Sequence, residues 1–219
     1  MQEVKNTVPA ENQMVNASEL SFLGEASAPL RVLVLGNSIT RHGPKADIGW
    51  NGDWGMAASA PEKDYVHLLY TKLTEAGCDV YMRIRQSSCW ELHFREADCL
   101  SRFAEERDFG ADVLVYRLGE NVESKDIPYY KSAVKELLTY LNIKPGRTIL
   151  TSRFWGREDM DEPLRQIARE RGDIFVSTAC TDDSMMALGQ FAHQGVSVHP
   201  GDKGMEMIAS NIFSVFPKV

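Results

Sequence analysis

Five short apolar segments recur along the chain, and amphipathic segments separate them. The first, residues 30–35, is almost continuously apolar and is followed by Gly36. A run of this kind is typical of a strand that is covered on both faces, as strands are in a parallel sheet. The other four runs cover residues 80–84, 113–118, 148–151 and 174–176.

The segments between these runs have the patterns of helices. We expect helices over about residues 59–77, 95–107, 126–141 and 162–171, and a last helix after Pro200. In the first of them, Ser59 and Glu62 are spaced as a capping box at the helix start. The last helix has apolar residues at the spacing of a single helix face, namely Met205, Ile208, Ala209, Ile212 and Phe213.

Alternation of strand and helix five times over predicts a doubly wound parallel sheet with right-handed crossovers. The chain has 219 residues, of which 43% are hydrophobic, and this is enough for one substantial core. We expect one α/β domain over residues 31–219. An arm over residues 1–30 precedes it and includes a short strand near residues 20–23.

Charge and composition argue against several classes of protein. The net charge of −7 is unsuited to binding nucleic acid or anionic membranes. No run of about 18 apolar residues that could cross a bilayer is present, and no N-terminal segment resembles a signal peptide. We therefore expect no nucleic-acid or membrane partner and, if the start is native, a cytoplasmic protein. An export signal removed upstream would leave no trace, and a homo-oligomer stays open.

The sequence also predicts no metal or organic cofactor. The four cysteines form no C-x-x-C pair and are interpreted as reduced packing residues. His193 and His199 are six residues apart and do not share a helix face, which argues against a metal site. No glycine motif for phosphate binding follows a strand, and this disfavours a nucleotide-binding module.

Three polar segments fall at, or face, the carboxyl ends of the predicted strands, where an open α/β sheet binds its ligands. Ser38 follows the first run, Asn121 follows the third, and His199 precedes the last helix. A serine hydroxyl can attack a carbonyl, a neutral histidine can take its proton, and an asparagine amide can donate to the developing oxyanion. Each residue has a commoner structural role, but the occurrence of all three in this order favours the catalytic one.

These segments resemble the sequence blocks of the GDSL/SGNH hydrolase family. Residues 35–40 resemble the first block, with Asn37 in place of the usual aspartate, residues 118–121 the G-x-N block, and residues 199–205 the last block. The resemblance spans about residues 31–215 and implies a flavodoxin-like, three-layer α/β/α fold with a five-stranded parallel sheet. It implies an esterase without a cofactor, in which Ser38 is the nucleophile and His199 the base. The Ser38 backbone N–H, the Asn121 amide and one further backbone N–H would hold the oxyanion.

The second block departs from the family's pattern. There the family supplies a glycine N–H to the oxyanion, whereas residues 85–91 of this chain contain no glycine. The backbone N–H of Ser87 or Ser88 can take its place if the local backbone suits a residue with a side chain. We favour Ser87 as the third oxyanion donor.

The last block departs from the pattern as well. Three residues before the histidine the family usually has an aspartate, and this chain has Val196. Loss of the acid from a working triad costs about 10⁴-fold in rate. We favour a backbone carbonyl as the acceptor of the His199 proton, which makes a Ser–His dyad. Four acidic residues stay open as alternatives: Glu91, Glu120, Asp182 and Asp183.

Several side chains near these blocks are expected to contact the substrate. The long segment 40–59 contains Trp50 and Trp54, which either stack on sugar rings at the site or anchor their own loop. Asn37 lies beside the nucleophile, and Trp90 and Glu91 follow the second predicted strand. These five residues form the predicted substrate-binding set.

The predicted function is hydrolysis of small acyl esters through an acyl-enzyme on Ser38. Acetyl esters of carbohydrates are preferred by analogy with the family, so the expected substrate is a small-molecule or oligosaccharide ester. A non-catalytic carbohydrate-binding relative is an alternative that the missing acid favours. A lipase-like acyl hydrolase or thioesterase is another, although it would need a long apolar channel.

Overall fold

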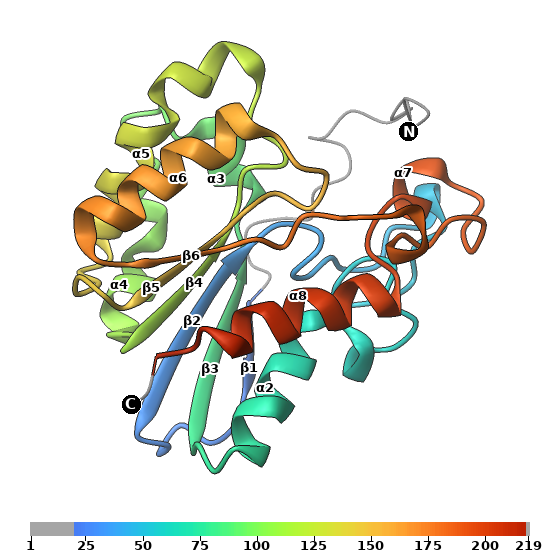
Figure 1. Cartoon of the computed structure of the whole chain (residues 1–219), viewed down its shortest axis with the longest axis horizontal. Helices are drawn as coiled ribbons and strands as arrows, with labels where there is room; N and C mark the ends of the chain where they lie inside the picture. The colour runs from blue at the N-terminus through green and yellow to red at the C-terminus, as the bar shows by residue number, and fades with distance from the viewer. Residues whose placement is uncertain (1–19, 218–219) are drawn as a thin grey trace.

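The computed structural model of the chain describes residues 20–217. Its centre is a six-stranded sheet in the order β1-β3-β2-β4-β5-β6 (Figure 1). The strands are β1 (Leu20–Leu23), β2 (Leu30–Gly36), β3 (Val80–Gln86), β4 (Val113–Arg117), β5 (Thr148–Thr151) and β6 (Ile174–Val176). Strands β2 to β6 are parallel, and their spatial order is the flavodoxin-like 2-1-3-4-5 when they are counted along the chain. The predicted fold class and all five predicted strands are confirmed.

The sheet has one strand more than the five expected. Strand β1 pairs with the outer edge of β3 in the antiparallel direction, with Leu20 opposite Arg85. The short strand predicted near residues 20–23 is therefore present, and it belongs to the sheet itself. Because β1 is only four residues long and half-exposed, its sequence carries no sign of which edge it joins. Residues 1–19 of the predicted arm lie outside the described residues.

Helices cover both faces of the sheet. The α-helices are α2 (Tyr65–Glu75), α3 (Ser88–His93), α4 (Ala104–Phe109), α5 (Ile127–Tyr140), α6 (Glu158–Arg171), α7 (Gln194–Ser197) and α8 (Asp202–Ser214). Helices α3 to α6 lie on one face, and α2 and α8 pack together on the other (Figure 1). Within residues 20–217, no helix combines the length and the apolar character needed to cross a bilayer.

The central strand β2 shows why its sequence is apolar at nearly every position. Successive side chains of a strand point to opposite faces of the sheet. Leu33 and Leu35 enter the core beneath α5 and α6, whereas Val32 and Val34 enter the core beneath α2 and α8. Both faces of the strand are buried, so both sets of positions need apolar residues.

Two predicted helices differ from the structure. No continuous helix covers residues 95–107. Helix α3 ends before this range, and within it a 3-10 turn (Leu100–Phe103) leads into α4. The first helix begins at Tyr65, because Asp64 caps it by accepting the His67 backbone N–H at 2.8 Å. Ser59 is not the cap; its N–H and hydroxyl donate to Asp202 at the start of α8.

Candidate active site

Ser38 and His199 meet at the carboxyl end of β2, although they are far apart in the sequence. The Ser38 Oγ lies 2.8 Å from the His199 Nε2. Strand β2 is central in the sheet, between β3 and β4, and the chain crosses over in opposite directions from it. This switch point is where an open α/β sheet has its crevice for ligands.

The turn after β2 exposes Ser38 and buries its neighbours. The backbone N–H groups of Thr40 and Arg41 both donate to the Asn37 carbonyl, which closes a tight turn around Ser38. A Cβ on Gly36 would lie 1.7 Å from the Thr40 Oγ1, so only glycine fits at this position. Asn37 and Ile39 are fully buried, whereas Ser38 is partly exposed. The turn thus presents one hydroxyl at the edge of the sheet.

A backbone carbonyl orients the imidazole of His199. Its Nδ1 lies 2.6 Å from the carbonyl oxygen of Gly195, in α7. A carbonyl can only accept, so the proton resides on Nδ1 and the lone pair of Nε2 faces Ser38. This is the arrangement favoured from the sequence, and none of the four alternative acids hydrogen-bonds to His199 in the described part of the chain. The position usually held by aspartate, Val196, is fully buried in an apolar cluster with Trp50.

His199 is held in its neutral form. Burial lowers the pKa of His199 to about 4, and the Gly195 carbonyl opposes this only in part. The ring is 5% exposed, and the Trp155 ring meets it edge-on at a centroid distance of 5.4 Å. Trp155 is fixed in turn by the hydrogen bond from its Nε1 to the Val198 carbonyl at 3.2 Å. A neutral, immobilised imidazole beside a hydroxyl can act as a general base.

Asn121 follows β4, and the buried carboxylate of Glu91 holds it. The Asn121 Nδ2 donates to one Glu91 oxygen at 2.5 Å, and the Asn121 backbone N–H donates to the other at 3.4 Å. The Gly119 N–H also donates to Glu91. One N–H of the Asn121 amide is used in this way, and its second N–H has no partner within residues 20–217.

Comparison with known structures gives this arrangement a family context. A protein described as a GDSL-like lipase from Parabacteroides merdae ATCC 43184 superposes with a TM-score of 0.55 at 19% identity, over 85% of this chain and 95% of its own. A family 3 carbohydrate esterase of Clostridium thermocellum superposes with a TM-score of 0.54 at 12% identity, over 84% and 94%. A two-domain esterase active on acetylated mannans gives 0.50 at 19% identity, over 84% of this chain and 47% of its own. No protein-family model and no curated protein matches the sequence.

The chain has the SGNH hydrolase fold. The resemblance expected from the three sequence blocks is thereby confirmed at the level of the fold. Of the three segments that resemble SGNH blocks, the structure brings Ser38 and His199 into direct contact. Asn121, after β4, is connected to the turn of Ser38 through Glu91 and Asn37.

Asn37, at the position of the SGNH aspartate, is used entirely inside the protein. Its amide donates to Glu91 at 3.3 Å and to Glu120 at 2.6 Å. Its Oδ1 accepts the Ile39 N–H at 3.2 Å and a guanidinium N–H of Arg117 at 3.4 Å. Both polar atoms of the Asn37 side chain are therefore used within the protein, and the structure gives no support to its predicted role in substrate binding.

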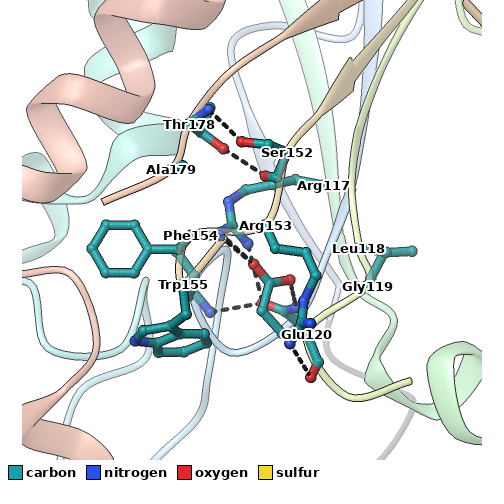
Figure 2. Close-up of polar contacts among 12 residues, drawn as sticks. Arg117, Leu118, Gly119, Glu120, Ser152, Arg153, Phe154, Trp155, Thr178 and Ala179 are labelled. Carbon is teal, nitrogen blue, oxygen red and sulfur yellow. Dashed lines mark hydrogen bonds and ion pairs between the residues drawn. The ribbon is translucent and has the colours of Figure 1, made fainter. Parts of the chain in front are cut away.

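A second buried carboxylate, Glu120, anchors the segment after β4 (Figure 2). It accepts from Arg117 at 2.8 Å and from the Phe154 backbone N–H at 3.0 Å, while the Arg153 guanidinium donates to the Glu120 carbonyl at 3.0 Å. Although burial opposes the shift, Arg117 and Arg153 lower the pKa of Glu120. Burial raises the pKa of Glu91 to about 7, and the nearby charge of Glu120 adds to the effect. The two carboxyls thus have opposite shifts.

The third oxyanion donor expected from the sequence is not available. The Ser87 backbone N–H donates to the Gly36 carbonyl at 2.6 Å. The alternative, the Ser88 N–H, donates to the Gln86 side chain at 3.1 Å. The first bond continues the pairing of β3 with β2, and the second is local to the end of β3. Both donors are therefore occupied, and the preference for Ser87 is corrected.

Three other predicted substrate residues point into the protein. Trp90 is 1% exposed and packs between Tyr116 and Phe94 in the core beneath α5. Glu91 is fully buried and binds only protein N–H groups in the described part of the chain. Trp50 is 2% exposed and donates to the His42 carbonyl, so it anchors its own loop. Trp90 and Glu91 lie in the short helix α3 and Trp50 in the loop after Ser38, and which face of such a short segment is buried depends on the tertiary packing.

Trp54 remains a candidate for substrate contact. It is partly exposed, although its Nε1 is bound to the Ala58 carbonyl at 2.9 Å and its ring packs edge-on against Trp50 at 5.6 Å. Two residues that contact His199, Trp155 and Gly195, were not among those predicted. Trp155 follows the predicted strand over residues 148–151, and this position at a strand end could have marked it as a site residue. No feature of the sequence marks which carbonyl accepts the histidine proton.

Proposed function

We propose that the protein is a serine esterase that hydrolyses small acyl esters. The observation that carries the proposal is the chain of contacts from the Ser38 hydroxyl through the His199 imidazole to the Gly195 carbonyl, at 2.8 and 2.6 Å. A nucleophile within hydrogen-bond reach of a base, with the base oriented by a third group, is the signature of nucleophilic catalysis. Here a carbonyl takes the place of the acid.

In the proposed acylation step, the Ser38 oxygen attacks the ester carbonyl and its proton moves to the His199 Nε2. The oxyanion receives hydrogen bonds from the Ser38 backbone N–H and the free N–H of Asn121. The tetrahedral adduct collapses, and the alcohol leaves with the proton from Nε2. Water then attacks the acyl-enzyme, again losing its proton to His199, and the carboxylic acid leaves as Ser38 regains its hydrogen.

Acetylated carbohydrates are the proposed substrate class. Two structural neighbours support this choice by their names, one a carbohydrate esterase and the other an esterase active on acetylated mannans. Trp54, partly exposed after Ser38, is suited to stack on a sugar ring. Acetate release from acetylated oligosaccharides tests the substrate class, while sugar binding without release would favour a non-catalytic binding protein.

The test of the esterase itself compares the wild type with Ser38→Ala on p-nitrophenyl acetate. We expect the variant to lose at least about 10³-fold in kcat, since removing a nucleophile leaves only oxyanion stabilisation and binding. Ser152→Ala is the matched control, because Ser152 is a buried serine that bonds to Thr178 in the next strand-end segment (Figure 2). Unchanged hydrolysis in Ser38→Ala, or a phosphonate that labels a residue other than Ser38, would reject the proposal.

A further inference from the structure

We propose that Glu91 is a positioning residue that fixes the amide of Asn121 relative to Ser38, an inference that rests on the esterase activity proposed above. Glu91 comes from α3, whereas the groups it binds come from the turns after β2 and β4. Its side chain is fully buried. Within residues 20–217, its carboxylate contacts no cation and accepts only from amide N–H groups.

The Glu91 carboxylate accepts two hydrogen bonds from Asn121. Its Oε2 accepts from the Asn121 side chain at 2.5 Å, and its Oε1 accepts from the Asn121 backbone at 3.4 Å. An amide group held by one N–H cannot rotate without breaking that bond, so its other N–H keeps one direction. Donors fixed in advance stabilise an oxyanion because they need no reorganisation when the charge develops.

Gly119, which precedes Glu120 in the segment after β4, also donates a hydrogen bond to the Glu91 carboxylate. Gly119 has a φ of 137°, a conformation that side chains rarely allow, and it turns its N–H toward Glu91. The N–H would be buried without an acceptor if Glu91 were apolar, at a cost of about 1–3 kcal/mol. Hydrogen bonds to an ionised acceptor are about twice as strong as neutral ones. A carboxylate therefore suits this convergence of donors better than a neutral amide, which would present an N–H to one of them.

Asn37 connects the Glu91–Asn121 pair to the turn that carries Ser38. Its amide donates to both Glu91 and Glu120, and its backbone carbonyl closes the turn that carries Ser38. The segment with Asn121 and the turn with Ser38 are thus tied to the same two carboxylates. One buried hydrogen-bond network thus fixes the position of Ser38 relative to Asn121, and within that network Glu91 is the residue that contacts Asn121.

The first test measures kcat and KM for p-nitrophenyl acetate in Glu91→Gln, Asn121→Ala and the double variant. We expect Glu91→Gln to lower kcat by about 10- to 100-fold with KM changed less than about threefold, since a misplaced oxyanion donor weakens only the transition state. In the Asn121→Ala background, Glu91→Gln should cost less than about threefold more. Losses that multiply in the double variant, or a loss confined to KM, would overturn the proposal.

A matched control separates positioning from lost stability. Glu106→Gln removes another buried carboxylate, 1% exposed, which binds Arg83 and Arg85 and does not contact the site. It should lower stability while its effect on kcat multiplies with that of Asn121→Ala. If Glu106→Gln reproduced the non-additive pattern of Glu91→Gln, the effect would be general destabilisation and the proposal would be wrong.

Nuclear magnetic resonance of the wild type tests the contact without any variant, in case Glu91→Gln does not fold. The Glu91 side-chain carboxyl, the Gly119 N–H and the Asn121 side-chain N–H should titrate with one common midpoint. Separate midpoints would overturn the proposal. If the wild type neither hydrolyses esters nor reacts with a phosphonate at Ser38, the proposed function fails and the catalytic role of Glu91 with it. Multiplicative losses in an active, phosphonate-reactive enzyme would overturn positioning alone.

Discussion

The Asn37 side chain lies between two buried carboxyl groups, those of Glu91 and Glu120, and donates a hydrogen bond to each. Its amide nitrogen lies 2.6 Å from Glu120 and 3.3 Å from Glu91, and it supplies a hydrogen to each. An aspartate here, as in the usual family block, would bring a third carboxyl group against these two. The neighbouring residues Glu91 and Glu120 therefore favour asparagine over aspartate at this position.

Replacing Asn37 by aspartate should destabilise the protein. We expect Asn37→Asp to lower the free energy of unfolding by about 3 kcal/mol or more, because two donors are lost and a buried charge is added. Urea denaturation at pH 7 measures the change. Asn142→Asp, the same replacement at an exposed position, is the control and should have little effect. A stable Asn37→Asp protein would contradict the arrangement of these three side chains.

At the scale of elements, the four-residue helix α7 supplies the carbonyl that accepts the Nδ1 proton of His199, the position that an acid takes in a triad. It presents the Gly195 carbonyl to His199 and turns the next side chain, Val196, into an apolar cluster with Ile48, Trp50 and Ala187. The same short helix thus supplies the acceptor and closes the long loop after Ser38. Figure 1 shows α7 beside the loop after Ser38, near the N-terminal end of α8.

Restoring the family's acid should not restore a triad. Val196→Asp would place a carboxylate in a fully buried apolar cluster, with no partner there, at a cost of several kcal/mol. We expect the free energy of unfolding to fall and kcat for p-nitrophenyl acetate not to rise. Val196→Thr keeps the shape and adds only a hydroxyl, so it should lose less stability. A rise in kcat in Val196→Asp would show that this position can reach the imidazole.

Across the whole molecule, three buried groups with shifted pKa values contribute to the response of stability to acid, namely His42, His199 and Glu91. Burial lowers the pKa of both His42 and His199 from 6.5 to about 4, so the folded state keeps them neutral where the unfolded state binds protons. Their contribution to stability is present above pH 6.5 and is lost as pH falls toward 4. Burial raises the pKa of Glu91 from 4.5 to about 7, so its contribution is lost as pH rises through that range.

The two histidines outweigh the one glutamate between about pH 4.5 and 6.5. From these groups the unfolded state binds about one proton more than the folded state near pH 5, and the difference shrinks toward pH 6.5 as the unfolded histidines lose their protons. Stability should therefore rise with pH over this range by about 1 kcal/mol per unit. Guanidinium denaturation at pH 5 and pH 6.5 measures this slope. His42→Asn should roughly remove it, because one of the two buried neutral histidines is then absent. A slope of opposite sign in the wild type would contradict the neutral state of the buried histidines.

The sequence by itself determined the five parallel strands and the chain positions of the groups proposed to react. Apolar periodicity is local, so residues 148–151 and 174–176 were predicted with the boundaries that the structure has. Polar residues after such runs must gather at one edge of a parallel sheet, which placed Ser38, Asn121 and His199 together. This part follows from chain connectivity and burial, which a sequence records directly.

Only the tertiary structure decided which groups surround those three residues. Trp90 and Glu91 follow a strand just as Ser38 does, yet the first packs in the core and the second binds buried N–H groups. The acceptor of the His199 proton is the backbone carbonyl of Gly195. Because every residue has a carbonyl, the sequence does not show which one accepts. Hydrogen bonds among buried polar groups depend on distances and directions between distant segments, and these arise only when the layers have packed.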